Sequence, residues 1–356
     1  MTRFLAAILA VLAADCGPTP SQLDTDNPVR EVPAAPYGLE EFFEGVPPPQ
    51  PARVRLGRWL FYDTRLSGDG SLSCATCHRP EHAFSEPRPV AIGMGGQRGR
   101  RKTPSLVNLA SRTILDPETD IGPAFFWDGR AKTLEEQVLV PIADAAEMGL
   151  PHSEMLARLS AIRGYRPYVR EAFGSEDFTR ERVAAALSDY VRTRRSGNAP
   201  YDQWAYGKNG RAMSERAQRG SDIFFFGGRC GVCHAGFNFS DGLFHNLGVG
   251  WNAATQTFAD EGRAIITGNS GDRGRFKTPG LRDVAKRAPY MHDGSLATLE
   301  DVVEFYNRGG VANPWRSARI IKPLNLTPED AGALVEFLEA LNGEGYLDVA
   351  PKYFPK

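Results

Sequence analysis

Two copies of the pattern Cys-x-x-Cys-His constrain this chain more than any other feature of its sequence. The first copy runs from Cys74 to His78 and the second from Cys230 to His234. The sequence has five cysteines, and only Cys16 lies outside these motifs. No pair is therefore left for a structural disulfide, and the chemistry of the remaining thiols belongs to the two motifs.

Two thiols at this spacing can form thioethers with the two vinyl groups of one haem, and the adjacent histidine is then placed to ligate the iron. A zinc site would bring four thiolates together, typically from pairs roughly 12–20 residues apart, whereas these pairs are 156 residues apart (230 − 74). A thioredoxin-like redox pair explains neither the histidine nor the duplication. The motifs therefore predict two covalently bound haem c groups. Their predicted attachment and ligating residues are Cys74, Cys77 and His78 in the first motif and Cys230, Cys233 and His234 in the second.

A second shared stretch indicates that the chain is a tandem duplication. Trp127 lies 165 residues before His292, and the same offset aligns Thr133–Glu135 with Thr298–Glu300. Thr133 begins a capping-box sequence, and apolar residues at helical spacing follow in both copies, so each copy should form a helix there. The sequence thus predicts a mainly α-helical protein built from two similar units.

The two predicted helices differ at the position that faces the haem. At the 165-residue offset, Pro141 of the first copy corresponds to Tyr306 of the second. A phenolate can ligate iron, whereas a proline ring has no donor atom, and an iron with both axial positions filled cannot bind peroxide. We therefore expect Tyr306 to be the second ligand of the haem on His234, and the haem on His78 to have an open face unless another side chain reaches it. The alternative for Tyr306 is a core tyrosine with a satisfied hydroxyl.

Three further residues near the first helix are candidates for catalysis. Gln137 shares the inward face of that helix, and Glu147 follows its end. A carboxylate beside bound peroxide can carry a proton from the inner to the outer oxygen, and an amide can orient water or the peroxide. Trp127 precedes the helix, where an indole can relay electrons between two haems. The alternatives are a polar residue on or after a helix for the first two and a large buried aromatic at an interface for Trp127.

The start of the chain has the composition of an export signal. Arg3 gives a positive region, and Phe4–Ala14 is an apolar run too short to span a bilayer. We expect a signal segment over residues 1–16 and a periplasmic protein without a transmembrane span. Cys16 is either a lipid-modified first residue or a cysteine in or beside the discarded signal, and Asp15 before it fits lipidation badly.

The net charge and the polar, turn-rich stretches predict the partners and the domain boundaries. The net charge of −1 gives no reason to expect a nucleic-acid partner. Residues 17–51 are rich in proline and acidic residues, which indicates an extended lead-in. Ser196–Gly210 is polar and contains glycine, which predicts a linker. The domains are accordingly predicted at residues 52–200, with the peroxide-reactive haem, and at residues 210–356, with the electron-transfer haem.

With these motifs in place, the chain resembles the bacterial di-haem cytochrome c peroxidase family from roughly Arg53 to Leu341. The resemblance rests on the two Cys-x-x-Cys-His motifs, on Trp-Asp-Gly-Arg at Trp127–Arg130 and on Pro-Tyr-Met-His-Asp-Gly at Pro289–Gly294. It implies two tandem cytochrome c-like helical domains, each with one covalently bound haem c. It also implies that the first haem reacts with hydrogen peroxide and that the second supplies or stores an electron.

The resemblance assigns roles to individual residues. The family's bridging tryptophan, active-site glutamine and active-site glutamate match Trp127, Gln137 and Glu147. Ordinary members have methionine at the position of Tyr306 and the MauG-type branch has tyrosine, so the resemblance points to that branch. Ordinary members also have a distal histidine where this chain has Met94, a candidate weak ligand of the first haem iron.

Two departures from the family limit what can be carried over. MauG draws electrons from its protein substrate through a surface tryptophan, and Gly228 occupies that place here. This argues against maturation of tryptophan tryptophylquinone in methylamine dehydrogenase. The family also binds calcium between the haems with help from an asparagine, and that place is Lys102. The ammonium of Lys102 could substitute for the cation, so we expect a weak or absent calcium site.

The prediction is therefore a haem peroxidase of the cytochrome-c peroxidase or MauG type. Its electrons come from a small donor protein, such as a c-type cytochrome or a cupredoxin, or from side chains of a protein substrate, which keeps tryptophylquinone-type maturation open. The alternative is a non-catalytic di-haem electron-transfer cytochrome whose two irons are both six-coordinate. An absorption spectrum of the ferric protein separates the two hypotheses, because only the enzyme has a high-spin component.

Overall fold

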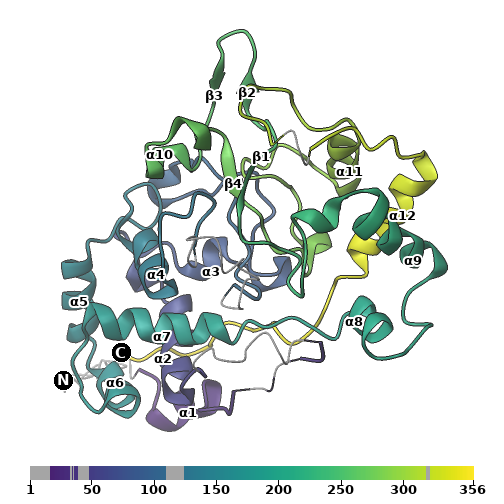
Figure 1. The fold of residues 1–356 in the computed structure, drawn as a ribbon. Coiled ribbons are helices and arrows are strands. Elements are labelled where there is room, and N and C mark those ends of the chain that lie inside the picture. The colour runs from purple at the N-terminus through teal and green to yellow at the C-terminus, as the bar shows by residue number, and fades with distance from the viewer. Residues whose placement is uncertain (1–16, 33, 35, 39–47, 110–123, 318–320) are drawn as a thin grey trace, which may run out of the picture.

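The computed structural model describes residues 17–32, 34, 36–38, 48–109, 124–317 and 321–356 (Figure 1). The expected signal segment over residues 1–16, including Cys16, lies outside the described residues, as does part of the expected lead-in. The described part of that lead-in is not extended throughout, because Pro20–Asp26 forms a capped helix whose Leu23 packs in the core of the first half. Among the described helices, none combines the length and apolar character needed to cross a membrane.

The described part of the chain is mainly helical, as expected, with four short strands. The α-helices are α1 (Pro20–Asp26), α2 (Pro51–Tyr62), α3 (Cys74–Cys77), α4 (Leu134–Ala143), α5 (His152–Ala161), α6 (Arg166–Phe173), α7 (Arg180–Arg192), α8 (Pro200–Ala205), α9 (Glu215–Asp222), α10 (Ala264–Thr267), α11 (Leu299–Asn307) and α12 (Pro328–Glu339). Short 3-10 turns lie at Thr64–Leu66, Pro80–His82, Met94–Gly96, Arg163–Tyr165, Cys230–Val232, Ser270–Asp272 and Val284–Lys286, and a π-helical turn at Ile223–Gly227.

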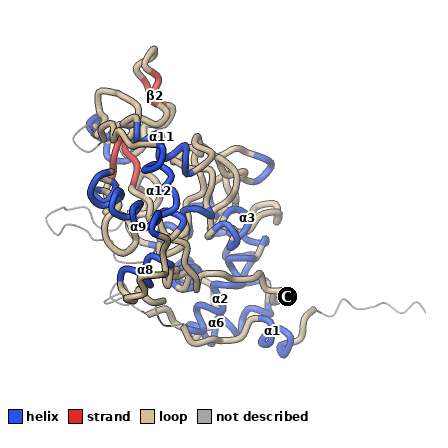
Figure 2. The backbone as a smooth tube through the Cα atoms, turned by 90° about the vertical axis from the view of Figure 1, so that its right-hand side faces the viewer, coloured by secondary structure: helices blue, strands red, loops and turns tan. Residues whose placement is uncertain are grey.

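The strands form two small antiparallel pairs. They are β1 (Phe244–Asn246), β2 (Trp251–Asn252), β3 (Thr257–Phe258) and β4 (Arg275–Lys277). Strand β1 pairs with β4, and the register places Phe244 opposite Lys277. Strand β2 pairs with β3 in a hairpin that projects from the end of the molecule far from α1 and α6 (Figures 1 and 2).

The two halves contain the same helix crossing, each made close by a glycine. In the first half α2 packs on α7, and a Cβ on Gly57 would lie 1.9 Å from the carbonyl oxygen of Ala186. In the second half α9 packs on α12, and a Cβ on Gly220 would lie 2.0 Å from the carbonyl oxygen of Ala333. Neither site has room for a larger residue. This shared contact supports the tandem duplication inferred from the sequence.

The haem-facing helices begin where the capping sequences predict. Thr133 accepts a hydrogen bond from the backbone of Glu136 at the start of α4, and Thr298 accepts one from Asp301 at the start of α11. Helix α4 continues through Pro141 and ends two residues later at Ala143. The proline therefore lies inside the last turn of the helix rather than stopping it.

Buried hydrophobic residues form two clusters, one for each half of the chain. The first draws on residues from Leu23 to Val191, together with Tyr346, and the second on residues from Tyr201 to Leu341. The end of the chain returns to the first half, where the indole Nε1 of Trp59 donates to the Tyr353 carbonyl at 2.9 Å. The exact domain boundaries stay a prediction.

The stretch expected to be a linker, Ser196–Gly210, instead contains an ordered element. It includes α8, whose Tyr201 belongs to the second hydrophobic cluster. Asp202 is fully buried and forms an ion pair with Arg282 at 2.6 Å. Its polar composition therefore reflects a buried ion pair and a short helix, because buried charges are stable when they are paired.

Candidate haem-binding and catalytic sites

The first Cys-x-x-Cys-His motif holds its histidine in an orientation suited to a metal. Nδ1 of His78 lies 2.9 Å from the carbonyl oxygen of Phe84, so the ring donates there and its Nε2 is left to act as a ligand. Burial lowers the pKa of His78, which favours the neutral ring that metals require. Burial raises the pKa of Cys74 to about 12 and that of Cys77 to about 11, so these thiols are not activated thiolates.

The second motif repeats this arrangement. Nδ1 of His234 lies 2.8 Å from the carbonyl oxygen of Phe239. Phe84 and Phe239 both adopt left-handed backbone conformations, with φ of 54° and 52°. Bulky residues rarely adopt positive φ, and such strain concentrates at functional sites. The same strained residue therefore orients the histidine in both halves.

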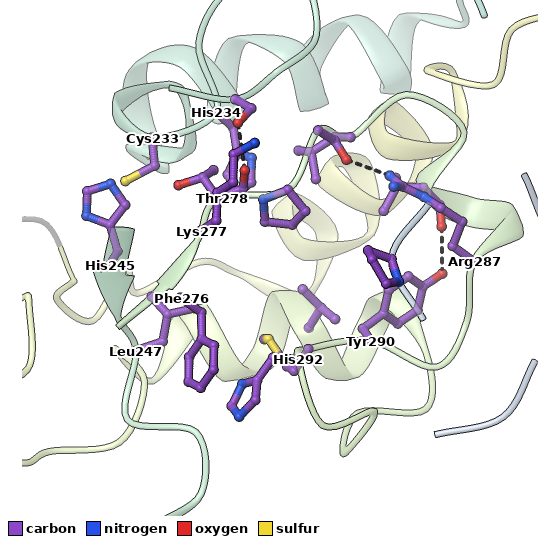
Figure 3. Close-up of a pocket in the computed structure, with 18 of the residues that line it drawn as sticks. Cys233, His234, His245, Leu247, Phe276, Lys277, Thr278, Arg287, Tyr290 and His292 are labelled. Carbon is purple, nitrogen blue, oxygen red and sulfur yellow. Dashed lines mark hydrogen bonds between the residues drawn. The ribbon is translucent and has the colours of Figure 1, made fainter. Parts of the chain in front are cut away.

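A cavity of about 300 Å³ lies between the second motif and the first half of the chain. Its lining includes Cys230, Cys233, His234 and Tyr306 from the second half and Thr103–Val107, Trp127 and Gln137 from the first. Figure 3 shows Lys277 and Thr278 beside Cys233 and His234, and Arg287 and Tyr290 on the opposite side.

The charges around this cavity fit a haem. Most of the lining is apolar, and among the described lining residues there are cations but no aspartate or glutamate. The lining cations are Lys102, Arg229, Lys277, Arg282, Arg287 and Lys322. An apolar slot with cations on its walls suits a flat apolar molecule that carries carboxylates, because buried charges need partners.

Tyr306 lies on α11 and lines the cavity together with His234. Burial, followed by the neighbouring Cys233 and Cys230, raises the pKa of its hydroxyl. Within the described residues, no hydrogen-bond partner is found for this hydroxyl. The assignment of Tyr306 as an iron ligand stays a prediction, and the observation that bears on it is that Tyr306 lines the same cavity as His234.

Helix α4 carries Gln137, and Glu147 lies in the turn that follows the helix. Gln137 is buried, lines the cavity, and its side-chain oxygen has no partner among the described residues. Burial raises the pKa of Glu147, with a further rise from Asp144 and an opposing effect of Arg130. The charge of Glu147 also raises the pKa of both cysteines of the first motif, so the carboxyl lies near the expected haem attachment.

Met94 lies beside the turn that carries Glu147. Its backbone N–H donates to the carbonyl of Glu147 at 2.8 Å. Its sulfur packs against Gly68 and its methyl group against Gly149, at positions where a Cβ on either glycine would collide with it. These contacts show a packing role for Met94, and its predicted ligation of the first iron stays a prediction.

Trp127 and His292, which occupy equivalent positions in the two copies, are joined through Lys102, and Trp127 is also bonded to Lys277. The backbone N–H of Lys102 donates to the carbonyl of His292 at 2.7 Å, and that of Lys277 donates to the carbonyl of Trp127 at 2.8 Å. The indole Nε1 of Trp127 also donates to the carbonyl of Lys102 at 2.8 Å. His292 stacks on Phe276 with ring centroids 3.6 Å apart. These bonds connect the two copies along one contact, which we call the seam between the repeats.

Lys102 is buried, and its ammonium has partners inside the protein. It donates to the carbonyl of Glu86, whose carboxylate accepts from Thr103 and pairs with Arg88 at 2.6 Å. Burial lowers the pKa of Lys102 to about 8, against the opposing effect of Glu86. A cation is therefore already present at the place where the family resemblance implied calcium.

Lys277 was missed in the sequence analysis, although a signal for it exists. Both copies contain Lys-Thr-Pro-x-Leu, at Lys102–Leu106 and at Lys277–Leu281, and the offset is 175 residues (277 − 102). This second repeated motif marks both lysines, because each directly precedes Thr-Pro.

Comparisons with known proteins agree with this geometry. The sequence profile of the family described as di-haem cytochrome c peroxidase matches residues 51–210. The methylamine utilization protein MauG of Methylorubrum extorquens is 40% identical over 85% of this chain and 82% of its own length. The cytochrome-c peroxidase IdrP2 of Denitromonas iodatirespirans is 35% identical over 84% of this chain and 83% of its own length. The cytochrome c551 peroxidase of Nitrosomonas europaea is 31% identical over 85% of this chain and 83% of its own length.

Solved structures give the same result. The crystal structure of a MauG-like protein associated with microbial copper homeostasis has a TM-score of 0.74 and 33% identity, and covers 84% of this chain and 94% of its own. The di-haem peroxidase BthA from Burkholderia thailandensis has a TM-score of 0.70 at 24% identity, covering 86% of this chain and 91% of its own, which shows the shared fold.

Proposed function

This chain belongs to the di-haem cytochrome c peroxidase family, and from that premise we propose how its two repeats divide a peroxidase reaction. It is a haem-containing oxidoreductase of the cytochrome-c peroxidase and MauG type. The first repeat carries the reaction with hydrogen peroxide, and the second exchanges electrons. The single observation that carries this division is the replacement of Tyr306 by Pro141 at the equivalent position of the first repeat.

The two motifs hold the haems covalently. Cys74 and Cys77 form the thioethers of the first haem and His78 ligates its iron. Cys230, Cys233 and His234 do the same for the second. When bound, haem c supplies an iron that exchanges electrons and that binds peroxide where an axial position is open. The hydrogen bonds from both histidines to phenylalanine carbonyls support this assignment, because they fix the ring and leave Nε2 as the ligand.

Glu147 and Gln137 supply the acid–base chemistry of the first site. The Glu147 carboxylate would accept a proton from one oxygen of peroxide and deliver it to the other oxygen, which leaves as water, and the two electrons for breaking the O–O bond would come from the bound haem. Burial raises the pKa of Glu147, which brings it closer to the operating pH. The buried amide of Gln137, whose oxygen has no partner among the described residues, orients water or peroxide.

Trp127 and Tyr306 serve electron transfer. Trp127 lies at the seam between the repeats, where its indole relays electrons between the two sites. Tyr306 would hold the second haem through its hydroxyl oxygen, and a hard anionic oxygen would favour oxidised iron. The cavity-facing hydroxyl without a protein partner supports this role for Tyr306.

The electron source is either a small redox protein, such as a c-type cytochrome or a cupredoxin, or side chains of a partner protein, as the relationship to MauG suggests. Gly228 stands in the place of the tryptophan that MauG uses to draw electrons from its substrate. The donor is therefore more in keeping with a peroxidase than with tryptophylquinone maturation. Export to the periplasm is proposed from the apolar start of the sequence.

The calcium site of the family is weak or absent in this protein. Lys102 already donates its ammonium to the Glu86 carbonyl, so a divalent cation there would meet a like charge. Metal analysis of the purified protein is expected to find iron without stoichiometric calcium. Stoichiometric calcium that survives chelation would reject this assignment.

Peroxide titration of the fully oxidised protein, followed by absorption, tests the proposed function. The expected result is a spectral change on addition of peroxide without prior reduction, since no distal histidine has to be released from the first haem. The competing function, a non-catalytic electron-transfer cytochrome, requires that peroxide leave the spectrum unchanged in both the oxidised and the reduced protein.

A further inference from the structure

Two lysines occupy equivalent positions in the two repeats, and their ammonium groups have different surroundings. Lys102 and Lys277 both precede Thr-Pro, and both bind the opposite repeat through their backbone N–H groups. Burial lowers the pKa of each side chain to about 8. Both copies have a lysine at this position although burial opposes its charged form. We take this as an indication that the positive charge has a function.

The ammonium of Lys102 has a hydrogen-bond acceptor among the described residues, whereas the ammonium of Lys277 has none there. The ammonium of Lys102 donates to the carbonyl of Glu86. That of Lys277 lies 5.8 Å from the ring centre of Phe125, and no hydrogen bond or ion pair to it is found in the described part of the chain. The carboxylate that raises its pKa, Asp241, is held by His245 at 2.8 Å.

Among the described residues, no acidic side chain lies in the cavity wall around the Lys277 ammonium. Lys277 lines the cavity beside Cys233 and His234 (Figure 3). None of the described residues that line this cavity is acidic. On the opposite side, Nε of the buried Arg287 also lacks a partner among the described residues. A buried cation without a counterion is costly, and the cost disappears when an anion enters the cavity.

We propose that Lys277 is the binding residue for a haem carboxylate at the seam between the repeats. The proposal rests on the proposed function, since it requires that haem fills the cavity. The ammonium donates to a propionate oxygen, and the backbone N–H of the same residue keeps its bond to the Trp127 carbonyl. Lys277 thereby fixes the position of the haem edge relative to the indole.

The proposal predicts which property of the haem depends on this residue. A positive charge next to the haem stabilises the reduced iron, whose net charge is lower, over the oxidised iron. Replacing Lys277 with a neutral residue should therefore lower the midpoint potential of the haem whose carboxylate it binds. The shift should be larger than that from an exposed cation, because exposed charges are screened by solvent.

The experiment is a redox titration of both haems in the holoprotein at neutral pH, together with haem content per chain. The variants are Lys277→Met, Lys277→Gln and Lys277→Arg. Gln keeps the length and a polar end, so it remains informative if the Met variant does not accumulate. Lys352→Met is the control, since it removes the same charge from an exposed residue outside the cavity lining.

We expect two haems per chain, a lowered potential of one haem in the Met or Gln variant, and a potential near the wild-type value in Lys277→Arg and in Lys352→Met. A shift in the second haem assigns the carboxylate to the haem of the cavity, and a shift in the first assigns it to the neighbouring haem. Unchanged potentials in Lys277→Gln, or an equal drop in Lys277→Arg, would overturn the proposal. A protein that retains two haems and reacts with peroxide would keep the proposed function even then.

Discussion

The two repeats of this protein share the same structural features around their motifs and differ at the positions that we expect to face the haems. Both use a Cys-x-x-Cys-His motif, a histidine bonded to the carbonyl of a strained phenylalanine, and a glycine-mediated helix crossing. At the haem-facing helix, Gln137 and Pro141 of α4 correspond to Val302 and Tyr306 of α11. The first copy has an amide whose oxygen has no partner among the described residues, one turn before a proline that cannot ligate iron, and the second copy has a valine one turn before the tyrosine proposed as a ligand.

This difference explains how two copies of one unit can differ in function, one for reaction with peroxide and one for electron transfer. The shared features hold a haem and are structural, so both copies keep them. The differing residues decide whether the second axial position is open or filled, which separates reaction with peroxide from electron transfer.

Pro141→Met would give the first repeat a ligand at the position of Tyr306. If Pro141 leaves the first haem open, the thioether should fill that position and abolish the reaction with peroxide. The variant should fold, because the substitution restores a backbone N–H inside α4. Stopped-flow absorption with peroxide checks the rate, and the ferric spectrum checks the spin state. Wild-type reactivity in a fully loaded variant would show that residue 141 does not face the iron.

Glu147→Gln should slow the reaction with peroxide by about a hundredfold to ten-thousandfold, the range typical of a lost acid–base group. The pH profile supplies a second test. Burial raises the pKa of Glu147 above the ordinary 4.5, so the wild-type rate should fall as pH decreases through that raised value, where the carboxylate becomes protonated. The variant should lack this decline. Glu154→Gln, on the exposed face of α5, is the control and should behave as wild type.

Tyr306→Met should convert the second repeat to the ligation of ordinary family members. The haem content should stay intact and the potential of the second haem should rise, because a thioether favours reduced iron more than a phenolate does. Redox titration measures this. Tyr290→Phe is the matched control, since that hydroxyl lies on the same cavity but donates to the Val284 carbonyl at 3.2 Å. An unchanged potential in Tyr306→Met would remove Tyr306 from the iron.

Gln137→Leu should have the smallest effect on the reaction and an opposite effect on stability. The Gln137 oxygen is buried without a partner, and such groups cost about 1–3 kcal/mol. An apolar residue of similar size should therefore increase the free energy of unfolding by about 1 kcal/mol while it slows the reaction with peroxide. Chemical denaturation and stopped-flow kinetics measure the two effects. A variant that is less stable than wild type would indicate that the amide has a partner in the folded protein.

Much of the helical frame could be predicted from the sequence because its signals are local. The capping threonines Thr133 and Thr298 and the apolar spacing after them fix two helices within a few residues. The duplication made the contrast between Pro141 and Tyr306 visible without a structure. Both predictions use only short-range chemistry and a constant offset.

Contacts between distant segments could not be predicted in the same way. The polar stretch around Asp202 was read as a linker, since nothing local shows that its carboxylate meets Arg282, 80 residues later, in a buried ion pair. The bonds that join Lys102 to His292 and Lys277 to Trp127 are also long-range. Their residues could be marked by the repeat, but their pairing depends on how the two halves pack.

Electron paramagnetic resonance of the fully oxidised protein, loaded with two haems per chain, tests the contrast between the repeats most directly. An iron with one open axial position gives a high-spin ferric signal, and an iron with two strong axial ligands gives a low-spin signal. The account predicts one signal of each kind, with the high-spin signal assigned to the haem on His78. Two low-spin signals would contradict it, because they would mean that both axial positions are filled in both repeats.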